Sequence, residues 1–585
     1  MKALIFNSGT GSRMGKLTES CPKCLLKLGD GESIFARQLR ILAECGITEA
    51  VVTTGKYEQE LLDESRLHPE IKVTFVNNPL YESTNYIYSM HLAGRYLDDD
   101  MLILHGDLVF DKHLVEKILS DSRKSLCLVN PDIAQPDKDF KGRIENGRLA
   151  EVGVNISGGS CYALQPMYKL SREDVQKWLD EVNAFVEKGV TDVYAENAFN
   201  AIAGGLSVYP LSYSGYYINE IDVPQDYERV CREISMADSG VCFGISSLKA
   251  LVERYGAKRP FAVTGRHIKG SAVDSLLCEL GMEEGRFFGV VENPDDECVE
   301  SALKAFAEYG GDMLISIGGG SAMDTAKAVK YHFCRNNKSS LVHIAVPTTA
   351  GSGSEATPFS VITSNGAKRS IADSTLLPEN AVLDSTLLYS MNEQQRKVSL
   401  LDALCHSVES LMTKGSNDES RGYAVYSIKL ILKNYADFVV GNTSVYDEIF
   451  AASYYAGKAI SITKTAVGHA MSYSLTTNYG VRHGQAAALC LISAFRQVEK
   501  ASCQSDVLDR ICTALECSEN QSISDRLTEI YTNMKLMHPF DLSGADPSEL
   551  AKRVNTERLG NSAITFTEKD VFEIYSDVKN RICSE

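Results

Sequence analysis

The chain has few features of a secreted, membrane-bound or nucleic-acid-binding protein. Its 585 residues contain one tryptophan, Trp178, and no run of about 18 apolar residues that would predict a transmembrane helix. The N-terminus becomes glycine-rich too early to be a signal peptide. Only 59 Lys and Arg face 77 Asp and Glu, and the net charge of −18 disfavours binding to phosphate backbones or anionic membranes. We expect a cytoplasmic protein that acts on small molecules and binds neither nucleic acid nor membranes.

The cysteines predict neither a set of disulfide bonds nor a metal site. The 16 cysteines are scattered, and the pair Cys21 and Cys24 has no second CxxC motif that would complete a metal site. Without a secretion signal, we expect reduced and mostly buried thiols.

Apolar runs alternate with helical patterns in two separate regions. Runs such as "KALIF" in residues 1–235 and "DMLISIGGG" in residues 241–390 are typical of α/β domains with largely parallel sheets. Long helical patterns such as "RGYAVYSIKLILKNYADFVV" dominate residues 391–585. The sequence therefore predicts an α/β protein with a Rossmann-like domain at 1–235, a second α/β domain at 241–390 and an all-helical domain at 391–585.

A glycine-rich loop follows the first expected strand. It reads "NSGTGSRMGKLTESCPKCLLKL" from Asn7, and a backbone with little Cβ bulk can wrap a phosphate chain. Arg13 and Lys23 add positive charge suited to a triphosphate. Asp107 ends a later strand, where α/β sheets place their ligands, and Asp222 lies in "NEIDVPQDYERV".

With these motifs, residues 1 to about 232 resemble the sugar-phosphate and phosphocholine nucleotidyltransferases, whose loop reads AAGxGSR and is followed by PKxLL. Asn7 and Ser8 replace the two alanines. The resemblance implies transfer from CTP, with Asp107 and Asp222 holding Mg²⁺ and with Arg13 and Lys23 as catalytic cations. Mg²⁺ and cations are needed because the reaction brings two anions together. The implied nucleotide contacts are Gly9, Gly11, Ser12 and Asn85.

The acceptor can be narrowed from the residues. The chain resembles cytidylyltransferases that charge phosphocholine or aminoethylphosphonate, and a trimethylammonium group requires an aromatic cage. Trp178 lies in an ordinary helical pattern, and Ala195 stands where phosphocholine enzymes tend to be aromatic. We therefore expect a phosphonate or phosphate acceptor other than phosphocholine. Its candidate contacts are Lys138, Lys141, Tyr162, Glu196 and Asn197.

Two further loops in the second half suit a dinucleotide. "DMLISIGGGSAMDTAK" reads as strand, glycine turn and helix start, which places a pyrophosphate at a helix N-terminus. "PTTAGSGSEAT" again follows an expected strand. The candidate cofactor contacts are Gly318, Gly319, Gly320, Ser321, Asp324, Thr348, Thr349 and Ser352.

Four residues form a candidate metal site. Asp402 and His406 in "SLLDALCHSVES" are four apart on one helix face, and His469 and His483 follow later. One carboxylate and three imidazoles suit Fe²⁺ or Zn²⁺.

The order of these motifs resembles the iron-containing alcohol dehydrogenases across about 240 to 585. The resemblance implies that Asp402, His406, His469 and His483 bind the metal, that Lys368 lies near the cofactor, and that the reaction is reversible hydride transfer. Tyr473 replaces a histidine of many members, so its hydroxyl either relays a proton or fills space. Gly265 stands where NAD-dependent relatives place an aspartate, and Arg266 follows. Room for a 2′-phosphate beside Arg266 favours NADPH over NADH.

One metabolite could connect the reactions of the two halves. A reductase for phosphonoacetaldehyde would supply 2-hydroxyethylphosphonate to a cytidylyltransferase, and Lys464 and Arg482 would contact the anion beside the ligand histidines. Two alternatives stay open: a polyol- or glycerol-phosphate pathway with the same two reactions, and a reductase with a non-catalytic nucleotide-binding N-terminal module. We expect small anionic phosphonates and nucleotides as partners, and a homo-oligomer.

Overall fold

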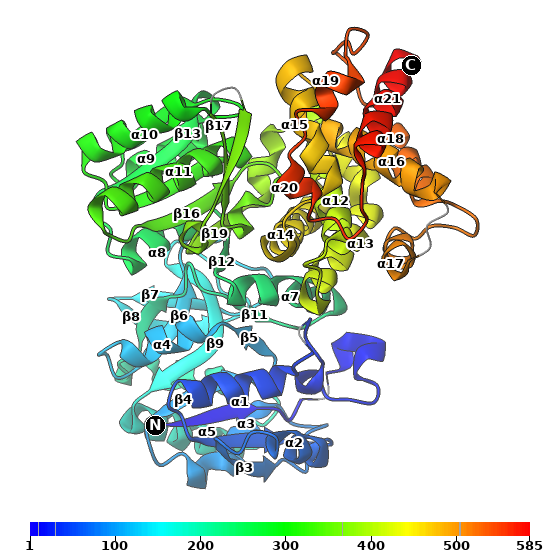
Figure 1. Ribbon diagram of the computed structural model, residues 1–585. Helices are drawn as coiled ribbons and strands as arrows, with labels where there is room; N and C mark the ends of the chain where they lie inside the picture. The colour runs from blue at the N-terminus through cyan, green and yellow to red at the C-terminus, as the bar shows by residue number, and fades with distance from the viewer. Residues whose placement is uncertain (10, 30, 365–366, 502–504, 585) are drawn as a thin grey trace. The chain divides into compact units, whose positions relative to one another are not determined.

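The computed structural model describes residues 1–9, 11–29, 31–364, 367–501 and 505–584. The chain divides into two compact units (Figure 1). The first comprises Met1–Cys242 with Ser246–Ala250, and the second comprises Phe243–Ile245 with Leu251–Glu585. Within the described residues, no helix is long and apolar enough to cross a membrane.

The first unit is built on a mixed sheet. Within the described residues the sheet has nine strands, with the order β10-β6-β9-β4-β1-β2-β3 and the hairpin β7–β8 attached to β9. The pairs among β1 to β4 are parallel, whereas β9 runs antiparallel to β4 and β6. The strands are β1 Lys2–Phe6, β2 Glu49–Thr54, β3 Lys72–Asn77, β4 Met101–His105, β6 Leu126–Asn130, β7 Lys141–Glu145, β8 Arg148–Gly153, β9 Cys161–Leu170 and β10 Tyr209–Ser212, with β5 Leu108–Phe110 and β11 Ile218–Glu220 paired separately.

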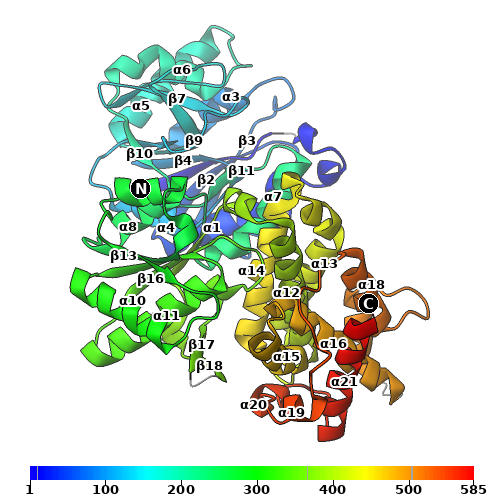
Figure 2. The same ribbon diagram turned by 90° about the horizontal axis from the view of Figure 1, so that it is seen from above.

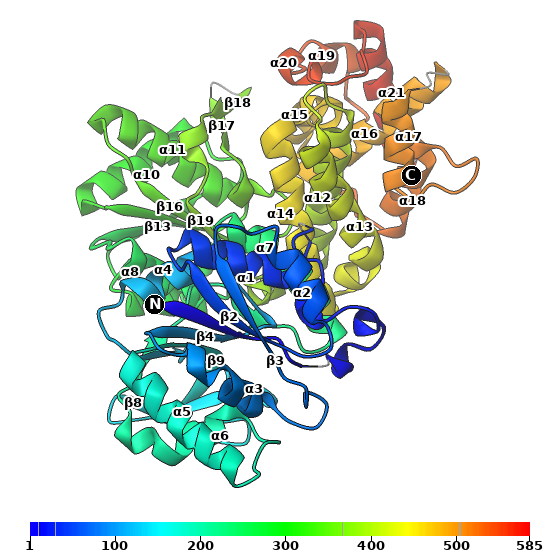
Figure 3. The same cartoon turned by 90° about the horizontal axis from the view of Figure 1, so that it is seen from below.

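Helices cover both faces of this sheet. The helices are α1 Ile34–Glu44, α2 Glu58–Ser65, α3 Tyr86–Ala93, α4 Lys112–Ser120, α5 Arg172–Glu187, α6 Ala195–Ile202 and α7 Pro224–Asp238. Helices α3, α5 and α6 share one apolar core with the sheet, and α1, α2 and α4 share another on the opposite face (Figures 2 and 3). Because both faces are buried, consecutive residues in the middle of a central strand are apolar, as in "ALI" of β1.

The second unit begins with another sheet. In the described residues it has six strands in the order β12-β19-β16-β15-β13-β14, and the pairs from β14 to β19 are parallel. The strands are β12 Val241–Phe243, β13 Pro260–Gly265, β14 Arg286–Val290, β15 Met313–Gly318, β16 Val342–Pro347 and β19 Asn380–Leu383, with the separate hairpin β17 Phe359–Ser364 and β18 Ala367–Ala372. The helices here are α9 Ala272–Glu279, α10 Asp296–Tyr309 and α11 Gly320–Asn337, while the residues of β12 and of α8 Ser247–Arg254 are divided between the two units.

Helices form the rest of the second unit, and α12 to α16 lie together in a bundle (Figure 1). They are α12 Glu393–Met412, α13 Asp418–Val440, α14 Tyr446–Thr463, α15 Val467–Tyr479, α16 His483–Lys500, α17 Asp506–Ala514, α18 Ile523–Asn533, α19 Pro547–Ala551, α20 Thr556–Leu559 and α21 Glu568–Ser584. Asn392 starts α12 with a capping box, and its last 13 residues are buried, which makes it the centre of the bundle. A Cβ at Gly457 of α14 would lie 2.3 Å from the Gly353 carbonyl oxygen, so glycine lets the loop after β16 pack directly on this helix.

The predicted fold class is confirmed. The first unit is an α/β domain, and the second combines an α/β part with a helical part.

Candidate active sites

The glycine-rich loop lines a cavity of about 370 Å³ in the first unit. Gly11 has φ +66°, a conformation that glycine adopts without strain, and a Cβ at Gly106 would lie 1.6 Å from Asn7 Oδ1. The Asn7 side chain, which replaces an alanine of the related loop, therefore fits only because residue 106 is glycine. The predicted residues that line this cavity are Gly9, Gly11, Ser12, Arg13, Lys23, Asn85, Asp107, Lys138 and Asp222.

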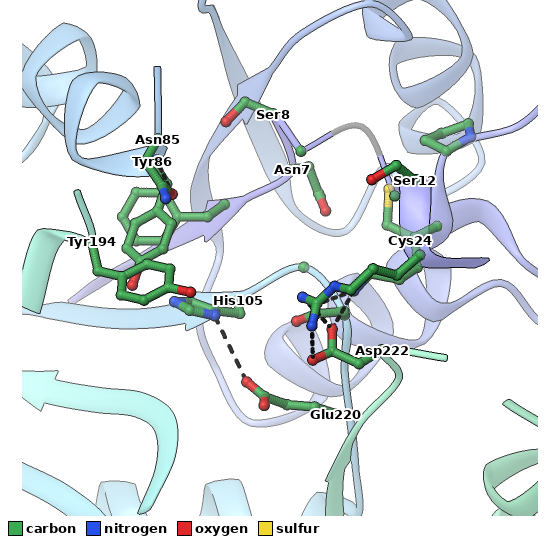
Figure 4. Close-up of a pocket in the computed structure, with 18 of the residues that line it drawn as sticks. Asn7, Ser8, Ser12, Cys24, Asn85, Tyr86, His105, Tyr194, Glu220 and Asp222 are labelled. Carbon is green, nitrogen blue, oxygen red and sulfur yellow. Dashed lines mark hydrogen bonds and ion pairs between the residues drawn. The ribbon is translucent and has the colours of Figure 1, made fainter. Parts of the chain in front are cut away.

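The predicted cations and carboxylates meet in this cavity. Figure 4 shows Asp222 there, with Glu220 nearby. The Lys23 ammonium donates to Asp107 and, at 3.1 Å, to Asp222. Arg13 also pairs with Asp222, at 3.1 Å. The two aspartates are 115 positions apart in sequence, and β4 and β11 bring them to the same cation.

Three further residues complete an acidic cluster that the sequence reasoning missed: His105, Asp139 and Glu220. The ligand atoms of His105, Asp107 and Glu220 lie within 4.8 Å of one another, as do those of Asp139, Glu220 and Asp222. Burial, reinforced by the charges of Asp107 and Asp222, raises the pKa of Glu220 well above its ordinary value. A divalent cation would relieve this repulsion, and oxygen donors are those that Mg²⁺ prefers.

A sequence signal for two of these residues exists. In "HGD" and "EID" a second ligand type stands two residues before the predicted aspartate, a spacing that would place both side chains on one face of a strand. Asp139 lies in the segment between β6 and β7 and carries no such signal.

Aromatic rings form another wall of the same cavity. The Tyr86 ring centroid lies 4.8 Å from that of His105 and 5.7 Å from that of Tyr194, and Phe140 lies 5.2 Å from Tyr194. In Figure 4, Tyr86 and Tyr194 lie beside His105, on the other side from Asp222. The argument against a trimethylammonium acceptor rested on Trp178 and Ala195, whereas these rings come from other, separate segments.

Four of the predicted acceptor residues lie outside the lining of this cavity. Lys141 is buried, and its ammonium donates to the Pro136 carbonyl at 2.6 Å. Glu196 is buried in α6 and accepts hydrogen bonds from Tyr86 and Tyr168, so it orients the aromatic wall from behind. Tyr162 lies on β9 and Asn197 is exposed on α6. Lys138 is the predicted acceptor residue that does line the cavity.

A second cavity, of about 800 Å³, lies in the second unit between the glycine loops and the helical bundle. Gly319 is the N-cap of α11, so the predicted glycine turn is the N-terminus of an 18-residue helix. Thr348 N–H donates to the Gly318 carbonyl at 2.9 Å, which holds the two loops side by side. The predicted residues that line this cavity are Gly319, Gly320, Ser321, Asp324, Thr349, Ser352, Lys368, Asp402, His406, Lys464, His469, Tyr473, Arg482 and His483.

The other predicted cofactor residues do not line the second cavity. Gly318 and Thr348 are buried behind the loops that line the cavity. Gly265 ends β13 and Arg266 is exposed directly after it, outside the cavity lining.

The four predicted metal ligands come together at the inner end of the second cavity. Asp402 Oδ1 lies 3.3 Å from His469 Nε2 and 3.9 Å from His483 Nε2, and the His406 ring stacks on His469 with centroids 4.5 Å apart. A Cβ at Gly484 would lie 2.2 Å from the Val398 carbonyl oxygen, so glycine allows α16 to approach α12 and present His483.

The protonation states of three of these four residues suit a metal, and His469 must lose a proton when a metal binds. Burial lowers the pKa of His406 to about 4, and burial together with the Lys368 ammonium lowers that of His483 well below its ordinary value. Burial alone would raise the pKa of Asp402, but the surrounding imidazoles hold it below its ordinary value. A carboxylate and neutral imidazoles are the forms that bind a cation, and one carboxylate with three imidazoles fits Fe²⁺ or Zn²⁺.

Glu409 orients one of these ligands and was not among the predicted residues. It is fully buried on α12, accepts His469 Nδ1–H at 2.7 Å, and accepts the N–H groups of Ala466 and His469 at 3.0 Å. Burial lowers the pKa of His469, but the carboxylates of Glu409 and Asp402 outweigh it and raise the pKa to about 9. With a metal at Nε2, the same carboxylate would fix the ring orientation through Nδ1.

Replacing Glu409 with glutamine should weaken metal binding without removing a ligand. We expect a loss of about 10- to 100-fold in metal affinity, because outer partners of ligand histidines contribute to this extent. The measurement is metal content during titration with a chelator. Glu393→Gln, exposed at the start of the same helix, is the matched control. An unchanged affinity in Glu409→Gln would contradict this role.

Tyr473 contacts a predicted metal ligand and two cationic side chains. Its ring stacks on His483 with centroids 5.7 Å apart, its hydroxyl accepts a hydrogen bond from Arg558, and Lys368 Nζ lies 5.0 Å from its ring centroid. Lys368 therefore lies near the metal ligands. Arg558, on the short helix α20, also lines the cavity and was not foreseen.

The two cavities, with their loops and ligand types, define an enzyme with a nucleotidyltransferase unit and an oxidoreductase unit. Residues 3–143 match the model of the MobA-like NTP transferase domain. Residues 241–385 match that of iron-containing alcohol dehydrogenase, and residues 398–578 match the C-terminal model of the same family. The chain belongs to the iron-containing alcohol dehydrogenase family, with an NTP transferase domain fused in front.

The relatives agree with this assignment. The chain is 30% identical over 274 residues to 1,3-propanediol dehydrogenase of Citrobacter freundii, which is 43% of this chain and 71% of that one. It is 28% identical over 334 residues to the bifunctional aldehyde-alcohol dehydrogenase AdhE of Escherichia coli, covering 52% of this chain but only 37% of the relative. The solved iron-containing alcohol dehydrogenase of Thermotoga maritima is 28% identical with a TM-score of 0.52, covering 58% of this chain and 98% of that one. Membership in this family implies a metal, iron or zinc, and a nicotinamide cofactor.

Proposed function

We propose that the chain is a bifunctional enzyme of phosphonate metabolism in the cytoplasm. The second unit reduces phosphonoacetaldehyde to 2-hydroxyethylphosphonate with NADPH, and the first unit transfers a cytidylyl group from CTP to the phosphonate. The observation that carries this proposal is the charge of the reductase cavity. Five cationic side chains line it together with the metal ligands, against three carboxylates outside the ligand set (Glu292, Asp324 and Glu557), and this excess favours a carbonyl substrate with an acidic head. The five are Lys368, Arg369, Lys464, Arg482 and Arg558.

In the reductase, Asp402, His406, His469 and His483 would hold the metal, and the N-terminus of α11 would receive the cofactor pyrophosphate. When bound, the metal polarises the carbonyl as a Lewis acid and the reduced nicotinamide supplies the hydride. Glu409 keeps His469 oriented, and the cations hold the anionic end of the substrate. Arg266, exposed at the end of β13, is proposed to bind the 2′-phosphate that distinguishes NADPH.

In the transferase, the acceptor oxygen attacks the α-phosphorus of CTP and pyrophosphate leaves. Asp107 and Asp222, with Glu220, would hold Mg²⁺, which neutralises the triphosphate when bound. The glycine-rich loop would follow the phosphate chain, and Arg13 and Lys23 would stabilise the negative charge that develops on it.

Two assays test the proposal. Purified, metal-loaded protein should oxidise NADPH, in preference to NADH, when phosphonoacetaldehyde is added. It should also release pyrophosphate from CTP with 2-hydroxyethylphosphonate, in preference to glycerol phosphate, aminoethylphosphonate and phosphocholine. Absence of the first activity would refute the reductase substrate. CTP binding without turnover on any acceptor would indicate a non-catalytic first unit.

A second candidate acceptor is phosphocholine. The rings of Tyr86, His105, Phe140 and Tyr194 in the first cavity favour it, because aromatic faces attract quaternary ammonium groups. A preference for phosphocholine in the same acceptor comparison would establish this alternative. It would also show that the two units do not act on the same metabolite.

A further inference from the structure

Arg558 and Lys368 both flank the Tyr473 ring in the reductase cavity. The Arg558 guanidinium carbon and Lys368 Nζ each lie 5.0 Å from the ring centroid. Arg558 also donates a hydrogen bond to the Tyr473 hydroxyl, which fixes where the guanidinium lies. Within the described residues, neither side chain forms a direct ion pair with a carboxylate, although the buried Asp324 carboxylate attracts both cations at longer range.

Two cations without acidic partners are costly beside each other in a partly buried cavity, because their charges repel and each loses water. Burial lowers the pKa of Lys368, and the carboxylates of Asp324 and Asp402 offset only part of this effect. Other buried lysines of this unit have partners: Lys327 donates to the carbonyls of Ser354, Thr357 and Phe359, and Lys330 pairs with Glu379 at 2.7 Å. The cavity is therefore arranged for an anion that arrives from outside.

The position of Arg558 and Lys368 relative to the predicted metal ligands indicates which end of a substrate they can bind. The Tyr473 ring, whose centroid lies 5.0 Å from each cation, also stacks on His483, so the two cations lie close to the predicted metal ligands. A short carbonyl compound with its oxygen toward the metal ligands would have its other end beside Arg558. The glycine loops at the N-terminus of α11 already offer backbone N–H groups for the cofactor phosphates.

We infer that Arg558, positioned by Tyr473 and assisted by Lys368, is the receptor for a tetrahedral oxyanion at the far end of the reductase substrate. A guanidinium suits this task because its planar fork binds two oxygens of a phosphonate or phosphate at once. This inference rests on the proposed reduction of an anionic aldehyde and names the residue that selects it. Lys464 and Arg482 are exposed at the cavity rim and would serve attraction rather than selection.

The test compares an anionic with a neutral aldehyde. We expect Arg558→Ala and Arg558→Gln to lower kcat/KM for phosphonoacetaldehyde by roughly 10- to 100-fold, the value of a charged hydrogen bond, while kcat/KM for propionaldehyde and KM for NADPH stay within about 3-fold. Arg558→Lys should recover part of the loss. Arg553→Ala, an exposed arginine five residues earlier, is the matched control. Equal losses for both aldehydes, or a raised KM for NADPH instead, would overturn the inference.

A second measurement does not depend on the proposed substrate. Methylphosphonate should inhibit propionaldehyde reduction by the unmodified enzyme competitively, and this inhibition should weaken at least about 10-fold in both neutral Arg558 variants. If methylphosphonate inhibits in this way but phosphonoacetaldehyde is not reduced, the result supports the anion receptor and refutes the proposed substrate. If methylphosphonate does not inhibit, or inhibits the variants equally, the receptor itself is refuted.

Tyr473→Phe distinguishes positioning from proton relay. As a positioning residue, Tyr473 should affect phosphonoacetaldehyde and methylphosphonate more than propionaldehyde, and the pH profile for propionaldehyde should not move. A common loss for both aldehydes with an altered pH profile would assign the hydroxyl to proton transfer and remove it from the receptor.

Discussion

The Asp402→Asn variant is expected to lose its reductase activity and its bound metal together. The substitution keeps the shape of the side chain but removes the one carboxylate among the predicted ligands, which lies 3.3 Å from His469 Nε2. We expect activity and metal affinity to fall roughly 100-fold or more, because outer partners alone account for 10- to 100-fold. Reductase kinetics and elemental analysis of the purified protein provide the measurement.

The controls for this variant use the two-unit architecture. Cytidylyl transfer should be unaffected, because Asp402 belongs to the second unit and the transferase residues to the first. Glu393→Gln on the same helix should retain both activities. An Asp402→Asn protein that keeps its metal and most of its reductase activity would show that the cluster is not the metal site.

The Asp222→Asn variant is expected to lose nucleotidyl transfer while the reductase continues to work. Asp222 accepts from both Arg13 and Lys23 and lies in the acidic cluster with Glu220, so its loss removes a candidate Mg²⁺ ligand and releases both cations. We expect kcat to fall roughly 10²- to 10³-fold, the usual effect of removing a group that stabilises transition-state charge. Pyrophosphate release measured across a Mg²⁺ titration should also show a higher Mg²⁺ requirement.

Glu228→Gln provides the matched control for Asp222→Asn. This glutamate is exposed on α7, six residues along the chain. Full activity in Asp222→Asn would exclude this carboxylate from the metal site. Equal losses in both variants would indicate a general effect of charge on this surface.

Much of the fold could be predicted because the relevant signals are local. The glycine turn before α11 follows a buried strand directly, so strand, turn and helix are read from 16 consecutive residues, as are the Asp402 and His406 pair from one helical turn. Four of the five acceptor candidates lie outside the cavity lining, and two of them, Lys141 and Glu196, have suitable chemistry but are buried against Pro136 and Tyr86. Burial of a polar side chain depends on what packs over it, and no pattern in its own segment reveals that.

The sequence by itself determined the two catalytic classes and their order along the chain, and it predicted the types of metal ligand, because loop chemistry and ligand chemistry are properties of short segments. Only the tertiary structure decided which distant residues act together. Glu409 meets His469 across 60 positions, Tyr473 meets Arg558 across 85, and Glu220 meets His105 across 115. Such contacts depend on how helices pack and on the order of strands in a sheet, and these are settled by the burial of the whole core.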